Sequence, residues 1–161
     1  MMRIAIAADH EGYPLKEELK RFLQELGHET HDLGTHSTES VDYPRFAEAV
    51  GLELTTGKAD RGILVCGSGV GVTVAANKIP GIRCGMCHDY YSAHQSVEHD
   101  DANVIALGSR VVGTAVAKEL VQAFLDARFS GLERHRRRLD QIQEMERRYC
   151  RALVGESAEK A

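Results

Sequence analysis

Residues 61–71, RGILVCGSGVG, join a short apolar run to a loop that has three glycines in five residues. An apolar run without alternating polar residues is typical of a strand that is buried on both faces of a sheet. Glycines directly after such a strand let the backbone approach an anion, and the helix that begins there directs free N–H groups toward it. The segment therefore predicts a strand, an anion-binding loop and a helix.

Apolar runs and amphipathic stretches continue to alternate on both sides of this segment. Leu15, Leu19, Phe22, Leu23 and Leu26 recur at helical spacing, and the following Gly27 is typical of a C-terminal cap. A second helix is expected between Pro44 and Gly57, because proline favours a first helical turn and glycine the position after the last one. Strands are predicted at residues 3–8, 29–33, 61–66, 82–87 and 104–107.

Four more helices complete the predicted order of elements. One begins in the glycine loop and stops before Pro80, one covers residues 89–98, one covers the apolar positions 116–125, and a charged one runs over about 133–153. Five strands that alternate with helices predict an α/β fold with a parallel sheet and helices on both faces. We expect one domain over residues 1–153 and a disordered tail over residues 154–161.

Composition excludes several classes of function. The net charge is −4, 6% of the residues are aromatic and tryptophan is absent, which argues against a non-specific binder of nucleic acid or of a membrane surface. No apolar run approaches the ~20 residues that span a bilayer, and Asp9 ends the first apolar run too early for a signal peptide. Four irregularly spaced cysteines do not suggest a disulfide framework, so we expect reduced thiols in a cytoplasmic protein.

One cysteine is a candidate catalytic residue, and two others are expected to have a structural role. A cysteine at the end of a buried strand is usually an inert small hydrophobe, but Cys66 precedes a helix N-terminus, whose field lowers a thiol pKa from about 8.5 toward neutrality. The loop after it is neither a dinucleotide fingerprint, since Val72 occupies the last glycine position, nor a Walker A motif. A tight turn without a ligand is the alternative. Cys84 and Cys87 lie within one predicted strand and point to opposite faces, which favours a structural role.

Charged and titratable residues cluster near the expected ligand-binding edge, the carboxyl ends of the strands. His10 follows the first strand and His99 ends the fourth helix, so either side chain is a candidate to face these ends. Asp9 is expected to orient a histidine or to cap the first turn. Arg134 and Arg138 share one face of the last helix and form a candidate phosphate clamp, with a solvated basic face as the alternative.

Together these motifs resemble the type B ribose-5-phosphate isomerases and their relatives, which include galactose- and allose-6-phosphate isomerases. The likeness covers roughly residues 3–150. It rests on IAIAADHEG at 4–12, DYP at 42–44, CGSGVG at 66–71, AANKIPGIR at 75–83, EHDDANVIALGSRVVG at 98–113 and R-H-x-x-R at 134–138. The resemblance implies a three-layer αβα Rossmann-like fold with a five-stranded parallel sheet and a C-terminal helix. It also implies no metal or organic cofactor, and a homodimer or a dimer of dimers.

The resemblance also implies a role for each site residue. Cys66 would be the base that moves a proton between C1 and C2, and His99 the acid that opens the furanose ring. Asp9 and His10 would hold the substrate near the ring oxygen and the phosphate. Where many members have Asn, this chain has Asp100, which adds a carboxylate beside the sugar. The resemblance also implies that the enediolate is bound by the backbone of Gly67, Ser68, Gly69, Val70 and Gly71. It implies that the phosphate is bound by Arg110, Arg134 and Arg138.

The sequence thus predicts an aldose-ketose isomerase that acts on a sugar phosphate, ribose 5-phosphate in the first place. An allose- or galactose-6-phosphate isomerase on the same scaffold is the nearest alternative, because the length of the pocket decides between them. A non-catalytic phosphosugar- or nucleotide-binding module is the alternative of another class, but it would need neither Cys66 nor His99. The resemblance further suggests an active site shared between two subunits, one of which supplies Cys66 and the other His99 and the arginines. Nucleic acid and membrane partners are not expected.

Overall fold

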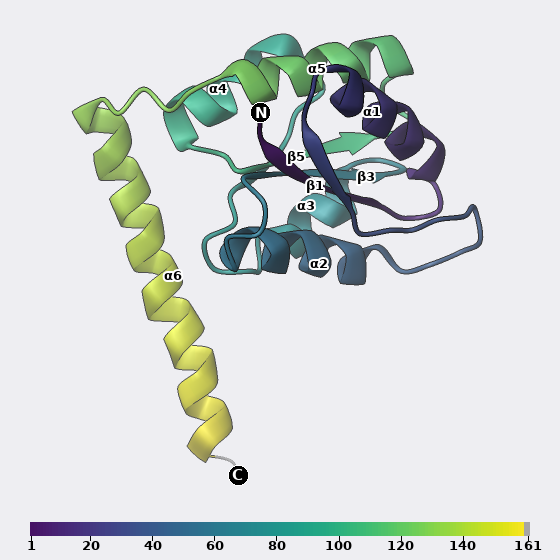
Figure 1. Cartoon of the computed structure of the whole chain (residues 1–161). Helices are drawn as coiled ribbons and strands as arrows, with labels where there is room; N and C mark the ends of the chain where they lie inside the picture. Colours follow the sequence, from purple (N-terminus) through teal and green to yellow (C-terminus); the bar gives the residue numbers. More distant parts are fainter. Residues whose placement is uncertain (160–161) are drawn as a thin grey trace.

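A five-stranded parallel sheet with the strand order β2-β1-β3-β5-β4 lies at the centre of the molecule (Figure 1). The computed structural model describes the backbone of residues 1–159 and the side chains of residues 1–150. The strands are β1 (Arg3–Ala8), β2 (Glu29–Asp32), β3 (Arg61–Cys66), β4 (Cys84–Met86) and β5 (Val104–Gly108). The helices are α1 (Tyr13–Glu25), α2 (Tyr43–Thr55), α3 (Val70–Ala76), α4 (Tyr90–Asp100), α5 (Thr114–Asp126) and α6 (Glu133–Glu159).

Two helical layers cover the sheet and bury it on both faces. Helices α1, α4 and α5 lie on one face, and α2 and α3 lie on the other (Figure 1). Alternate residues of each central strand therefore enter different cores: Ile63 packs with the α1, α4 and α5 layer, whereas Leu64 packs with α2 and α3. Burial of each such side chain stabilises the fold by about 1.5–3 kcal/mol. The predicted three-layer α/β fold with a five-stranded parallel sheet and a C-terminal helix is confirmed.

Among the strands, the largest difference from the predicted bounds concerns the fourth one. It covers Cys84–Met86 instead of residues 82–87. Ile82 lies before the strand, because its N–H donates to the carbonyl of Ile79 at 3.0 Å in a turn. Its side chain is nevertheless buried against the layer of α2 and α3, so its apolar character reflects packing rather than strand pairing. The predicted caps Gly27 and Gly57 both follow helices and have φ values of 78° and 73°.

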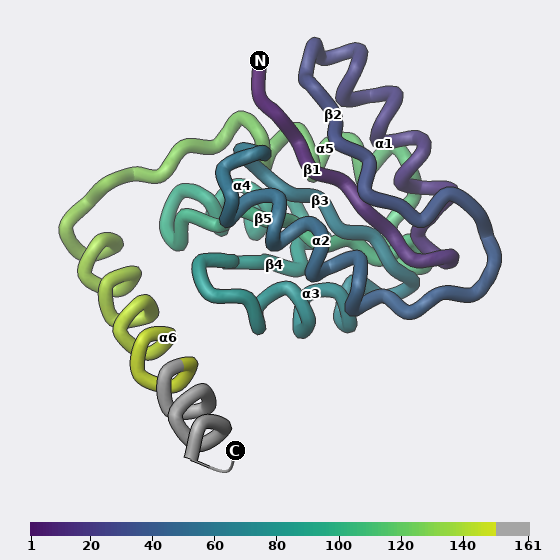
Figure 2. Tube along the Cα trace, turned by 60° about the horizontal axis from the view of Figure 1, so that its bottom comes forward, coloured from purple at the N-terminus to yellow at the C-terminus, as the bar shows by residue number. Residues whose placement is uncertain are grey.

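Helix α6 belongs to neither helical layer and runs beside the body (Figures 1 and 2), where the N–H of Gly81 donates to the carboxylate of Glu146 at 3.0 Å. Its first turns lie against the end of α4, where the N–H of Ser130 donates to the carbonyl of Glu98 at 2.9 Å. Further along, Ile142, Met145 and Tyr149 are 42%, 55% and 60% exposed. Of the tail expected to be disordered, residues 160 and 161 lie outside the described residues, as do all side chains after residue 150, and this expectation stays a prediction.

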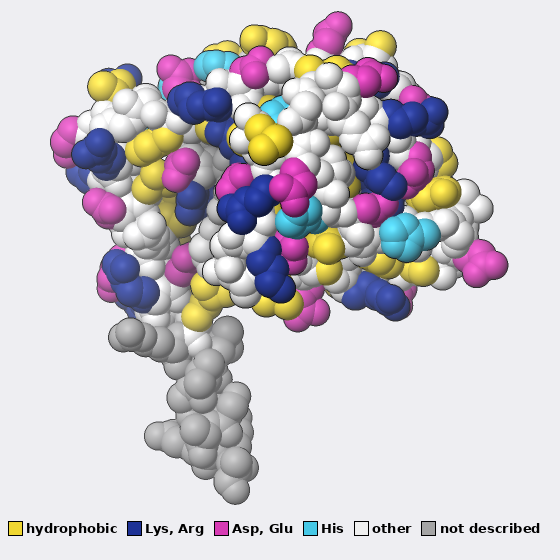
Figure 3. All heavy atoms as spheres, viewed as in Figure 1, with side chains coloured by type: hydrophobic (Ala, Val, Ile, Leu, Met, Phe, Trp, Pro, Cys, Tyr) yellow, Lys and Arg dark blue, Asp and Glu magenta, His cyan; other side chains and the backbone are white. Residues whose placement is uncertain are grey.

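The surface carries charges of both signs. Basic and acidic side chains are intermixed on the face that Figure 3 presents, as the small net charge of −4 requires. Within the part of the chain that the structure describes, no helix is both long enough and apolar enough to cross a membrane.

Candidate active site

A cavity of about 420 Å³ opens at the carboxyl ends of the central strands. Cys66 is the last residue of β3 and pairs with Gly108, the last residue of β5, so the register of the sheet fixes the position of the thiol. Six residues that the sequence singled out line this cavity, namely Asp9, Cys66, Gly67, Ser68, Gly71 and Arg110. The sequence also placed His10 here, and its side chain lies next to Glu11, another residue of the cavity wall.

The glycine loop supplies a backbone donor to the thiol. The N–H of Gly69 donates to Sγ of Cys66 at 3.1 Å, a contact that a thiolate accepts strongly. Gly69 has a φ of 80°, a conformation that side-chain-bearing residues rarely adopt. The N–H of Val70 donates to Oγ of Ser68 at 3.2 Å. Two of the amides expected to face an enediolate are therefore directed at side chains of the loop itself.

Two other buried thiols, Cys84 and Cys87, lie in surroundings that favour the protonated form. Burial raises the pKa of Cys84 to about 12, and burial also raises the pKa of Cys87. Both thiols therefore stay protonated at neutral pH and cannot act as bases. The structural interpretation of the C-x-x-C pair agrees with these surroundings.

Asp9 and His10 shape the turn that leads from β1 into α1. Oδ1 of Asp9 accepts the N–H groups of Glu11 and Gly12, each at 3.0 Å. The sequence left open whether Asp9 caps this turn, and the structure shows the capping contacts. Nδ1 of His10 accepts the N–H of Val41 at 3.2 Å. A neutral His10 ring with Nδ1 as an acceptor carries its proton on Nε2.

Three residues of the cavity wall, Glu11, Tyr43 and Val111, were not among the site residues expected from the sequence. Glu11 forms a two-point contact with Arg110, with Oε1 to Nη2 at 2.7 Å and Oε2 to Nε at 3.2 Å. Tyr43 covers the glycine loop so closely that a Cβ atom at Gly71 would lie 2.7 Å from its ring. The DYP motif at 42–44 was the sequence feature that could have indicated Tyr43 as a residue of the site. Glu11 and Arg110 are 99 positions apart, so no local pattern indicates their contact.

The remaining predicted residues, His99, Asp100, Arg134 and Arg138, do not line this cavity and lie toward the amino ends of the strands. His99 is on the last turn of α4, before β5 begins at Val104, whereas Cys66 pairs with the far end of β5. Four residue steps of a strand separate these ends by about 13 Å. Within one chain His99 therefore does not face the carboxyl ends of the strands, and its role as the ring-opening acid stays a prediction. A helix that follows a parallel strand returns along the sheet, so its last turn lies near the amino ends.

His99 and Asp100 form a second group of residues with the start of α6. The ring of His99 stacks on that of His135, with 4.3 Å between their centroids. His135 is 2% exposed, and its Nδ1 lies 2.6 Å from Oγ of Ser130. Burial and the nearby positive charges, Arg134 and Arg138 among them, lower the pKa of His135. The ring of His135 is therefore neutral at neutral pH.

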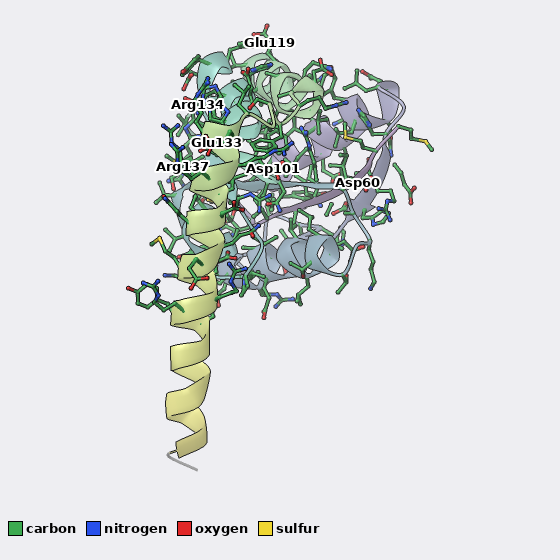
Figure 4. The ribbon with its side chains drawn as sticks, turned by 90° about the vertical axis from the view of Figure 1, so that its left-hand side faces the viewer. Asp60, Asp101, Glu119, Glu133, Arg134 and Arg137 are labelled. Atoms are coloured by element: carbon green, nitrogen blue, oxygen red, sulfur yellow. The ribbon has the colours of Figure 1, made fainter. Side chains whose placement is uncertain are left out.

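The arginines of this group are available for a ligand. Figure 4 shows Arg134, with Glu133 and Arg137, at the end of α6 that lies next to the body. Arg134 and Arg138 are exposed, and no ion pair within residues 1–150 involves either of them. Arg137, in contrast, pairs with Glu133 at 3.0 Å. No three His, Cys, Asp or Glu side chains in the described part of the chain converge as metal ligands do.

Gln95 joins two members of this second group, although the sequence analysis did not single it out. Its Nε2 lies 3.0 Å from Nδ1 of His99 and 3.2 Å from Oδ2 of Asp100. The spacing of four residues between Gln95 and His99 was the available signal, because such residues are neighbours on a helix.

Residues 4–142 match the sequence model of the family described as Ribose/Galactose Isomerase. The chain belongs to the ribose/galactose isomerase family. Ribose-5-phosphate isomerase B of Escherichia coli is 47% identical over 148 residues, which cover 92% of this chain and 99% of that protein. D-erythrulose-4-phosphate isomerase of Pectobacterium atrosepticum is 43% identical over 132 residues, which cover 81% of this chain and 87% of that protein.

A solved structure agrees with membership of the ribose/galactose isomerase family. Ribose-5-phosphate isomerase B of Clostridium thermocellum superposes with a TM-score of 0.90 at 49% sequence identity, and the match covers 92% of this chain and 99% of that one. The resemblance inferred from the motifs is therefore confirmed. The family match includes the Cys66 loop and Arg138, since both lie within residues 4–142.

Proposed function

We propose that the protein is an aldose-ketose isomerase that interconverts ribose 5-phosphate and ribulose 5-phosphate. The observation that carries this proposal is the position of Cys66, which lines a cavity of about 420 Å³ that also holds Arg110, with a backbone donor on its sulfur. Relatives named ribose-5-phosphate isomerase B match 92% of this chain, which supports the same substrate.

The first chemical step would open the furanose ring. The bond between C1 and the ring oxygen breaks, the ring oxygen gains a proton and the O1 hydroxyl loses one. His99 is the candidate acid, because its Nδ1 faces the amide of Gln95 and its Nε2 is the remaining position for the proton of a neutral ring. General acids of this kind contribute about 10²–10⁴ in rate.

The second step would move a proton between C2 and C1 of the open aldose. The Cys66 thiolate takes the C2 proton and forms a cis-enediolate with the negative charge on O1. A proton then passes from O2 to O1, and the thiol returns its proton to C1, which gives the ketose. A base at this position works best when its pKa is near the working pH. The developing charge on the enediolate needs fixed donors, and the backbone N–H groups of the glycine loop beside Cys66 are the candidates.

Both steps together require a second copy of the chain. Cys66 and His99 belong to one chain but lie at opposite ends of the strands, about 13 Å apart along the strand direction. A two-fold dimer resolves this separation if each chain brings His99, Arg134 and Arg138 to the cavity of the other. Helix α6 runs beside the body and leaves Ile142, Met145 and Tyr149 partly exposed, so it offers an apolar surface to a partner chain.

A coupled assay of the purified protein tests the proposal. Ribose 5-phosphate, allose 6-phosphate, galactose 6-phosphate and erythrulose 4-phosphate are offered under the same conditions, and kcat/KM is compared among them. We expect ribose 5-phosphate to give the highest value. A higher value for a hexose phosphate or the four-carbon sugar would replace the substrate in the proposal. Binding of all four without turnover would indicate a sugar-phosphate-binding module instead.

A further inference from the structure

We propose that Gln95 and Asp100 are positioning residues that fix the tautomer of His99, with the ring proton on Nε2. The inference rests on the proposed function, in which that proton opens the sugar ring. Gln95 lies one helical turn before His99 on α4, and its Nε2 atom lies within hydrogen-bond distance of both partners.

The chemistry of Asp100 determines which end of the Gln95 amide points inward. A carboxylate only accepts hydrogen bonds, whereas an amide has one donating and one accepting end. The group that faces Oδ2 of Asp100 at 3.2 Å must therefore be the NH₂ of Gln95. An asparagine at position 100 would impose no such direction, because its side chain offers both a donor and an acceptor.

The direction of the amide then determines the state of His99. The same NH₂ lies 3.0 Å from Nδ1 of His99. Since an NH₂ group only donates, Nδ1 must accept, and a neutral imidazole that accepts at Nδ1 carries its proton on Nε2. Asp100 thus acts on His99 through Gln95 and does not need to touch the reacting atoms.

The other surroundings of His99 restrict the plane of its ring. His135 stacks against it at an angle of 29° between the rings, and His135 is held in place by its contact with Ser130. The charged groups that face this pair of rings are Asp100 from α4 and Arg134 and Arg138 from α6. Stacking sets the plane and Gln95 sets the direction within that plane, so the Nε2–H bond has a defined orientation.

The tautomer can be measured directly in the free, full-length protein. NMR spectra of protein with ¹⁵N-labelled histidine distinguish Nε2–H from Nδ1–H rings, and the variant His99→Asn assigns the signal. We expect wild-type His99 to carry the proton on Nε2. Gln95→Glu keeps the size of the side chain but replaces the donor with an acceptor, so the proton should move to Nδ1. Asp100→Asn should give a mixture of both tautomers.

Kinetics provide the second readout. Gln95→Glu and Gln95→Leu should lower kcat for ribose 5-phosphate about tenfold, since a misdirected acid loses part of its contribution, and should change KM less than about twofold. Gln122→Leu is the matched control, because Gln122 also donates to a carboxylate one helical turn later, that of Asp126 at 2.8 Å, but lies on α5 and makes no hydrogen bond to His99. This control should keep wild-type kcat and the wild-type His99 signal.

Two outcomes would overturn the proposal: an unchanged Nε2–H tautomer in Gln95→Glu, or a kcat of the Gln95 variants equal to that of Gln122→Leu. The tautomer is measured without substrate, so its result does not depend on the proposed reaction. If the wild-type protein did not convert ribose 5-phosphate, the proposed function would fail while the NMR result still decided whether Gln95 and Asp100 position His99.

Discussion

The Cys66 cavity and the His99 group differ in what holds them in place. The cavity is built on sheet hydrogen bonds: the N–H of Ser109 donates to the carbonyl of Cys66 at 2.8 Å, and that of Arg110 donates to Gly67 at 3.0 Å. The His99 group instead forms where the end of one helix meets the start of another, through stacked rings and the contact between Ser130 and Glu98.

This difference separates two requirements of the proposed reaction. The position of the base depends on strand register alone, and a single folded chain satisfies it. In the proposed dimer, the position of the acid and of the phosphate clamp relative to that base depends on how the two copies associate. Mutations in the two regions should therefore have different consequences.

The largest expected effect is that of removing the base. Cys66→Ala should lower kcat by more than about a thousandfold, because it removes the proposed base. Steady-state kinetics and a thermal unfolding scan measure activity and folding. Cys84→Ala is the matched control, since it removes another buried thiol whose pKa is too high for a base, and it should keep most of the activity. If Cys66→Ala retained more than about a tenth of the wild-type rate, Cys66 would not be the base.

The second prediction tests whether the two regions come from different chains. Cys66→Ala and His99→Asn are each expected to be inactive. After equal amounts are mixed and subunits exchange, half of the dimers are mixed, and each has one intact site, so about a quarter of the wild-type activity should return. Mass spectrometry of isotope-labelled subunits verifies the exchange. A mixture that exchanges completely and stays inactive would place both residues in a site within one chain.

The third prediction concerns the phosphate clamp. Arg134→Ala and Arg138→Ala should each raise KM for ribose 5-phosphate about tenfold or more, since a hydrogen bond to a charged group contributes about 1.5–3 kcal/mol. Activity with free ribose should change little. Arg137→Ala is the control, because Arg137 lies on the same helix but pairs with Glu133. Equal effects of all three variants on KM would indicate a general basic surface rather than a clamp.

The smallest effect is expected at Glu11. Its carboxylate occupies the two-point face of Arg110 that a phosphate would use. Exposed pairs of this kind contribute about 0.2–1 kcal/mol, so Glu11→Gln should lower KM for ribose 5-phosphate about two- to threefold. Glu18→Gln removes a similar exposed pair with Arg21 on α1 and should leave KM unchanged. A higher KM in Glu11→Gln would mean that Glu11 orients Arg110 instead of competing for it.

The sequence predicted the Cys66 region better than the His99 region, for physical reasons. Strands β1 and β3 were predicted with their observed bounds, because both are continuous apolar runs next to polar residues. The thiol and its loop then follow from one local stretch of chain. In β4 the same reasoning extended the strand too far, because Ile82 is buried without pairing.

Contacts between distant segments could not be predicted in this way. The stack of His99 on His135 and the pair of Glu11 with Arg110 depend on which helices and loops the fold brings together. Whether His99 lies near the amino or the carboxyl ends of the strands also depends on the direction in which α4 runs along the sheet. Gln95 is different, since its spacing from His99 is local, but a glutamine on a helix has no distinctive pattern until its partners are seen.

The distance between Cys66 and His99 along the sheet also has a consequence for how the protein behaves at different concentrations. When two chains must meet to form one site, association and substrate binding become one linked equilibrium. If the site is shared as proposed, dilution below the dissociation constant of the dimer should lower specific activity even though every chain stays folded. In the proposed dimer, a sugar phosphate that contacts both chains would stabilise the dimer by RT ln(1 + [L]/Kd). Substrate should therefore reduce the loss of specific activity on dilution.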